Sequence, residues 1–260
     1  MREILARYDL TALAARLRQD QRHRRFSGLV EKAVSVASAH QDLLDAQACL
    51  ALLNELTTEA RLSRGWAKRK TSCAAGALFS QSIILYARAT TTKSENRRQW
   101  FGREKLSAEQ QEVHDLVMTL RNDTIAHFGF GNALSSGPLV KEALVLLVTK
   151  ERQGPVFYAS RIQNKSALAG QLLDLVEALV SATHVRALEL MNAAADALRE
   201  ACDLDPSLQD IVSSFEFDSE AFLPDPKMEE PLFAGMRLNK YSQSHHGASA
   251  DLRPERMIKR

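Results

Sequence analysis

Residues 166–201 read SALAGQLLDLVEALVSATHVRALELMNAAADALREA, and this stretch decides the fold class. Apolar and small side chains recur along it every three or four residues, a spacing that gathers them on one face of an α-helix. Such a face is stable only when it packs against other helices, so the sequence predicts a helical core. The stripe consists of Leu172, Val176, Leu179, Thr183, Ala187, Leu190, Ala194 and Leu198.

Further helices are expected upstream, because the first 137 residues contain no proline to interrupt them. Ser107 and Gln110 have the spacing of a capping box, in which each residue bonds the backbone of the other at a helix N-terminus. We expect this helix to end near Phe128, since Gly129 and Gly131 follow. The other predicted helices span about Asp9–Asp20, Gly28–Leu62 and Lys70–Ala89.

The residues between the last two helices change their pattern. Leu139–Thr149 and Val156–Ile162 are rich in β-branched and aromatic residues, and Gly154-Pro155 lies between them. This pattern predicts a β-hairpin. The expected architecture is therefore mostly α: an up-and-down bundle of four to five long helices over residues 1–203, with a hairpin insertion at about 139–162.

Residues 204–260 form a segment of different composition. Eight acids and one lysine fall between Asp205 and Glu230, together with several phenylalanines, and the chain becomes basic and polar from Arg237. This composition predicts a flexible tail. The alternative is that residues 205–230 dock on a basic surface, either of the domain or of a protein partner.

Bulk properties exclude several classes of protein. A hydrophobic fraction of 45% suits a globular chain, and a net charge of +2 gives no overall attraction to nucleic acid or anionic membrane. The three cysteines lack CxxC spacing, so neither a disulfide framework nor a zinc site is predicted. No signal peptide and no apolar run long enough to span a bilayer can be recognised. We expect a cytoplasmic protein without membrane association, metal or cofactor.

One short stretch carries residues suited to chemistry. Residues 121–127 read RNDTIAH and stand at the end of an otherwise amphipathic helix. Asp123 precedes His127 by four residues, so its carboxylate can orient the imidazole. The guanidinium of Arg121 forms a planar fork that suits a phosphate. The alternative is that this cluster only satisfies the groups of a helix end.

The spacing also bears on assembly. In an ideal α-helix, Arg121 and His127 lie about 120° apart around the axis and roughly 9 Å apart along it. One helix does not bring both side chains to one point. We therefore expect a homodimer in which a second copy completes the site across a two-fold axis.

An arginine, a polar residue and a histidine at this spacing resemble the motif of the HEPN superfamily, and the helical setting of about Gly28–Cys202 agrees with it. The resemblance implies a metal-independent endoribonuclease, with a role as a toxin or antiviral effector. A protein partner bound through residues 205–230 would then be an antitoxin or regulator. By analogy, His127 would act as general acid or base at the RNA 2′-hydroxyl or leaving oxygen, and Arg121 would stabilise the charge on the phosphorane. Asn122 and Asp123 would position these groups. The expected product carries a 2′,3′-cyclic phosphate.

Two basic stretches contain aromatic residues, a combination that suits single-stranded RNA. The alternative is that both stretches are solvated loops in which the aromatic residue anchors in the core. Trp66 and Phe101 belong to these stretches as well. The residues predicted to bind RNA are Arg64, Lys68, Arg69 and Lys70 in the first stretch, and Arg97, Arg98 and Trp100 in the second.

The sequence leaves two functions open. The first is a HEPN-type ribonuclease that cleaves RNA in a dimer cleft. The second is a catalytically silent HEPN-like scaffold that binds a protein partner. An exposed motif beside a basic surface would favour the enzyme, whereas a motif buried in ion pairs would favour the scaffold.

Overall fold

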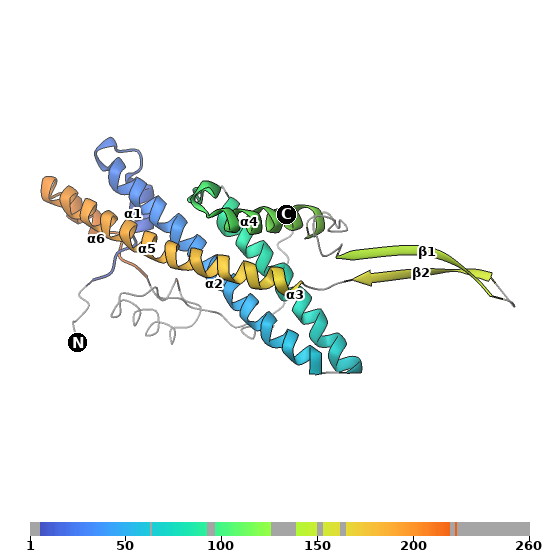
Figure 1. The fold of residues 1–260 in the computed structure, drawn as a ribbon. Helices are drawn as coiled ribbons and strands as arrows, with labels where there is room; N and C mark the ends of the chain where they lie inside the picture. The colour runs from blue at the N-terminus through green and yellow to red at the C-terminus, as the bar shows by residue number, and fades with distance from the viewer. Residues whose placement is uncertain are drawn as a thin grey trace, which may run out of the picture. The chain divides into compact units, whose positions relative to one another are not determined.

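The computed structural model of the chain describes residues 6–62, 64–92, 97–125, 139–149, 153–161, 165–218 and 222. The predicted fold class is confirmed: the described residues are mostly helical, with one small antiparallel hairpin (Figure 1). The helices are α1 (Leu10–Leu17), α2 (Arg24–Leu62), α3 (Gly65–Thr91), α4 (Ala108–Leu120), α5 (Ser166–Leu204) and α6 (Leu208–Ser213). The strands are β1 (Val140–Val148) and β2 (Gln153–Arg161), and short helical turns are η1 (Gln21–His23), η2 (Arg103–Lys105) and η3 (Arg121–Ile125).

The chain divides into two units, Leu10–Leu208 and Met1–Asp9 with Gln209–Arg260. In the second unit, the backbone of Asp9 donates to the carbonyl of Phe215 at 2.8 Å, and Phe217 donates to Arg7 at 2.9 Å. Structure therefore continues beyond the predicted boundary at residue 203. The flexibility expected for the tail stays a prediction, because nearly all residues after 218 lie outside the described part.

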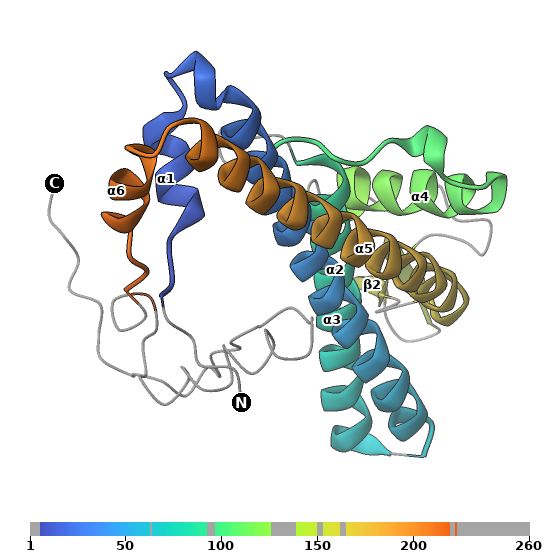
Figure 2. The ribbon, with the colours of Figure 1, turned by 90° about the vertical axis from the view of Figure 1, so that its left-hand side faces the viewer.

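In the unit Leu10–Leu208, helix α2 is central, because it packs against both α3 and α5 (Figure 2). The apolar stripe predicted for α5 faces this core: seven of its eight members are buried, and Leu198 is half-buried. Leu43 and Leu50 of α2 and Phe79 of α3 belong to the same cluster. Each fully buried side chain of this size stabilises the fold by about 1.5–3 kcal/mol.

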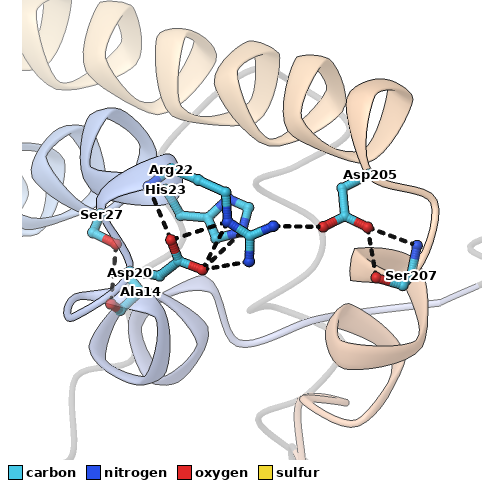
Figure 3. Close-up of polar contacts among 7 residues, drawn as sticks. All are labelled: Ala14, Asp20, Arg22, His23, Ser27, Asp205 and Ser207. Carbon is cyan, nitrogen blue, oxygen red and sulfur yellow. Dashed lines mark hydrogen bonds and ion pairs between the residues drawn. The ribbon is translucent and has the colours of Figure 1, made fainter.

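Polar contacts fix the corner between α1 and α2 to the end of α5 (Figure 3). The carboxylate of Asp20 accepts hydrogen bonds from the backbone nitrogen of Arg22 at 2.9 Å and from its guanidinium at 2.7 Å. The hydrogen bond from the Arg22 side chain lowers the pKa of Asp20 to about 2. The same guanidinium donates to Asp205 at 3.3 Å, and Asp205 also accepts from the hydroxyl of Ser207. The corner is thereby tied to the residues that follow α5.

The N-terminus of α4 has the predicted capping box. The Ser107 nitrogen donates to Gln110 Oε1 at 3.0 Å, and the Gln110 nitrogen donates to Ser107 Oγ at 3.3 Å. Further along α4, Val117 and Leu120 are buried in the core cluster. The cap and these two anchors fix the helix and thus the residues that follow Leu120.

No helix in the described ranges combines the length and the apolar character needed to cross a membrane.

Candidate functional site

The predicted motif begins where the regular α-helix ends. Helix α4 stops at Leu120, earlier than the end expected near Phe128, and Arg121–Ile125 form a π-helical turn. A π-helical turn closes i→i+5 hydrogen bonds and is wider than an α-turn, and such turns are frequent at functional sites. The angle of about 120° between Arg121 and His127 assumed α-geometry throughout. That assumption is wrong over Arg121–Ile125.

The described side chains of the motif face solvent. Arg121, Asn122 and Asp123 are all exposed, although Leu120 directly before them is almost fully buried. Arg121 Nη1 donates to Asn122 Oδ1 at 2.9 Å. This contact orients the guanidinium and leaves the motif accessible to a large ligand. His127 lies outside the described residues, so its pairing with Asp123 and the role of the second copy stay predictions.

The turn η3 also contacts α3, and α3 begins in the first basic stretch. Between α2 and α3 the chain reverses at Gly65, whose φ of 58° lies in the left-handed region that favours glycine. The five residues after Gly65, Trp66–Lys70, lie in the first turns of α3 and are all exposed. We call the exposed residues Arg61, Arg64, Trp66, Lys68, Arg69 and Lys70 the basic tip.

Trp66 is the aromatic residue of the basic tip. Its side chain is 74% exposed, and the guanidinium carbon of Arg69 lies 5.9 Å from the centroid of its ring. The interpretation of Trp66 as a core anchor is therefore wrong. An exposed indole among cations offers a surface on which a base can stack while phosphates contact the lysines and arginines.

The second basic stretch is built differently. Arg97 Nη1 lies 2.6 Å from a carboxylate oxygen of Asp42, and the two side chains are only 12% and 5% exposed. Arg97 also donates to the hydroxyl of Ser38 and to the carbonyl of Arg88 at 3.1 Å. Arg88 binds the same carboxylate, and its hydrogen bond to Asp42 raises the pKa of the Arg88 guanidinium. These contacts fasten the chain around Arg97 to α2 and α3.

Arg98 and Trp100 are also engaged within the domain. The backbone nitrogen of Arg98 donates to Ser35 Oγ at 3.0 Å, and its guanidinium pairs with Glu31. The indole N–H of Trp100 donates to the carbonyl of Ala89 at 2.7 Å, and its half-buried ring packs against the core. The structure thus gives Trp100 the anchoring position that the sequence left as an alternative. RNA binding by these three residues stays untested, but their polar groups already have partners.

A surface groove of about 560 Å³ runs between α4 and α5. Its lining includes the acidic residues Glu109, Glu112 and Asp174. Carboxylates repel phosphates, so this groove is unsuited to a nucleic acid. Neither here nor in any other described part of the chain do three His, Cys, Asp or Glu side chains gather in a set that could hold a metal ion.

Sequence reasoning treated the two basic stretches alike, and the structure separates them. The decisive feature is Asp42, a buried carboxylate inside the apolar pattern of α2. A lone acid at a helix position that faces the core indicates a basic partner from elsewhere in the chain. The sequence contains this signal, but the signal does not tell which arginine elsewhere in the chain is the partner, and both Arg88 and Arg97 pair with Asp42.

Comparisons of the chain with protein-family models, with curated proteins and with solved structures gave no match.

Proposed function

We propose that the chain is a metal-independent endoribonuclease of the HEPN type that cleaves RNA between two copies of itself. The observation that carries this proposal is the exposure of Arg121, Asn122 and Asp123 at the π-helical turn. These residues precede His127 by four to six positions in the sequence. Exposure is required of residues that meet a polymeric substrate. It also argues against the alternative that the motif is consumed in a buried helix cap.

The basic tip supports RNA as the substrate class. Its cations and exposed indole suit phosphate contacts and base stacking, and α3 connects this surface with the turn that holds Arg121. In the proposed reaction, a proton leaves the RNA 2′-hydroxyl and the oxygen attacks the adjacent phosphorus. The 5′-oxygen of the next nucleotide then departs with a proton. His127 transfers protons, and Arg121 stabilises the charge that develops on the phosphorane.

The test uses the full chain, end-labelled single-stranded RNA and excess EDTA. Wild type is expected to cleave, and His127→Ala is expected to be inactive. Phosphatase should leave the new ends unchanged until acid opens the cyclic phosphate. Equal cleavage by both proteins would indicate a contaminating nuclease and would contradict the assignment of His127.

A second candidate function is a catalytically silent HEPN-like protein that binds a protein partner. The exposed apolar side chains of the β1–β2 hairpin favour it. Absence of cleavage at every RNA and protein concentration tried, together with a bound partner that protects the hairpin, would favour this candidate over the enzyme.

A further inference from the structure

The β1–β2 hairpin exposes apolar side chains on both of its faces. The strands pair antiparallel in a single register, with Leu144 opposite Phe157 and Val145 opposite Val156. From Lys141 to Val148, every residue of β1 is exposed. In the described part of the chain the sheet has two strands, and Figure 1 shows a twisted ribbon with no helix packed on either face.

Such a hairpin is not self-sufficient. Two strands alone are at best marginally stable in water, and independent stability needs further strands or a packed face. No charged residue occurs in Ala143–Val148 or in Gly154–Ala159. A solvent-exposed sheet face normally carries polar residues, so this composition indicates a surface that is covered in the functional state.

The two faces are not equivalent. Leu144, Leu146, Val148 and Phe157 share one face, because side chains alternate along a strand and Leu144 pairs with Phe157. We call this set the apolar face; its members are 60–75% exposed. On the opposite face, Val145, Leu147, Val156 and Tyr158 are 38–51% exposed. The apolar face therefore has more surface to remove from water.

We propose that the apolar face binds the same face of a second copy of this chain across a two-fold axis. The four side chains that define the apolar face are aliphatic or aromatic, so this set is complementary to the same set on a second copy, as a two-fold interface requires. Two such faces, together with the rims of their hairpins, bring together roughly 1,000 Å², which is about the lower bound for a specific interface. The net charge of +2 offers little long-range repulsion between copies.

The edges of the hairpin favour contact through the face. Pro155 in β2 lacks an N–H, and a proline is tolerated in a strand where its nitrogen faces the outer edge. The outer edge of β2 thus lacks a donor at the third residue of the strand, which disfavours edge-to-edge growth there. Packing of one face on its copy closes after two chains. The proposal takes from the proposed function only the expectation of a homodimer, and it assigns the surface that forms it.

The test compares neighbouring leucines on opposite faces of one strand. Sedimentation velocity of the full chain, without RNA, should show a dimer at micromolar concentration. Leu146→Glu should raise the dissociation constant at least about 100-fold, because two like charges would meet in the interface. Leu147→Glu adds the same charge to the opposite face and should leave dimerisation within about threefold of wild type. Helical circular dichroism should be the same for all three proteins, since both leucines lie outside the core. Their melting should agree at concentrations low enough that wild type is also monomeric, because dimerisation itself stabilises the folded state.

Several results would overturn the proposal. One is a wild-type protein that is still monomeric at 100 micromolar. Another is an equal effect of Leu146→Glu and Leu147→Glu on the dissociation constant of the dimer. Binding to phosphatidylcholine vesicles by a monomer, abolished in Leu146→Glu, would assign the face to a lipid surface instead. His127→Ala should abolish RNA cleavage and leave dimerisation unchanged, so it tests the nuclease separately from the interface. A dimeric wild type that never cleaves RNA rejects the nuclease alone, whereas a dimer that cleaves RNA and is unaffected by Leu146→Glu rejects this interface alone.

Discussion

The guanidinium of Arg69 lies over the indole ring of Trp66, 5.9 Å from the ring centroid, on the exposed basic tip between α2 and α3. The pair presents a cation and an aromatic face side by side. Trp66→Ala should therefore weaken binding of single-stranded RNA by about 1–3 kcal/mol, the contribution of one stacked base. The measurement is fluorescence anisotropy with a labelled oligonucleotide. Trp66→Phe retains a ring and should recover most of the affinity.

The control for this substitution is the other tryptophan. Trp100 packs on the core and donates to Ala89, so Trp100→Ala should lower the free energy of unfolding by more than about 2 kcal/mol. Trp66→Ala should change it by less than about 0.5 kcal/mol, as expected at an exposed position. Loss of stability in Trp66→Ala would contradict its placement at the surface.

The two lysines of the basic tip test phosphate contacts. If Lys68 and Lys70 each contact one phosphate, the double change to alanine should reduce the slope of log affinity against log salt by about 1.4, since each contact on a single strand contributes about 0.7. Arg199→Ala removes an exposed charge from α5 and serves as the matched control. An unchanged slope in the double variant would place the RNA elsewhere.

Arg97 and Arg64 were both predicted to bind RNA, but their alanine variants should differ in stability. Arg97→Ala leaves the buried carboxylate of Asp42 with fewer donors, so it should cost about 1–3 kcal/mol of unfolding free energy. Arg64→Ala, at an exposed position, should cost less than about 0.5 kcal/mol. Urea denaturation of both variants measures the difference. Equal stability would mean that the Asp42 cluster does not hold the fold together.

Local signals were sufficient for much of the fold. The capping box of α4 needs only Ser107 and Gln110, three residues apart, and both hydrogen bonds are present. The partner of Arg97 could not be found in this way, because Asp42 lies 55 residues earlier and meets it only when α2 and α3 pack. The exposure of the hairpin could not be predicted from local signals either. A content of β-branched and aromatic residues predicts strands, but what covers each face depends on the rest of the assembly.

The histidine buried between α2 and α5 makes stability depend on pH. His40 Nδ1 lies 2.9 Å from Thr183 Oγ1, and burial, together with the nearby His184, lowers the pKa of His40. Below the ordinary value of 6.5, the unfolded chain binds a proton that the folded chain resists. The free energy of unfolding should therefore fall as the pH decreases from 6.5, by at most about 1.4 kcal/mol per pH unit for this group.

His40→Gln removes the titrating group and should flatten this dependence. Burial also lowers the pKa of His114, so part of the slope should remain in the single variant and disappear when His114 is also changed to glutamine. Chemical denaturation between pH 5 and 7.5 provides the measurement. A slope of the opposite sign would mean that the folded protein stabilises the charged imidazole.

Arg121→Lys separates catalysis from structure at the motif. Lysine keeps the positive charge but loses the planar fork, so a role in phosphate binding predicts a strong loss of cleavage rate with normal folding. Because Arg121 is exposed and its guanidinium bonds the side chain of its neighbour Asn122, the substitution should change the free energy of unfolding by less than about 0.5 kcal/mol. Arg199→Lys is the matched control, since Arg199 is also exposed and bonded to a nearby side chain on its own helix. Single-turnover cleavage and urea denaturation are measured on the same preparations. A rate that falls only in step with stability would make Arg121 a structural residue, and an unchanged rate with unchanged stability would remove it from the proposed site altogether.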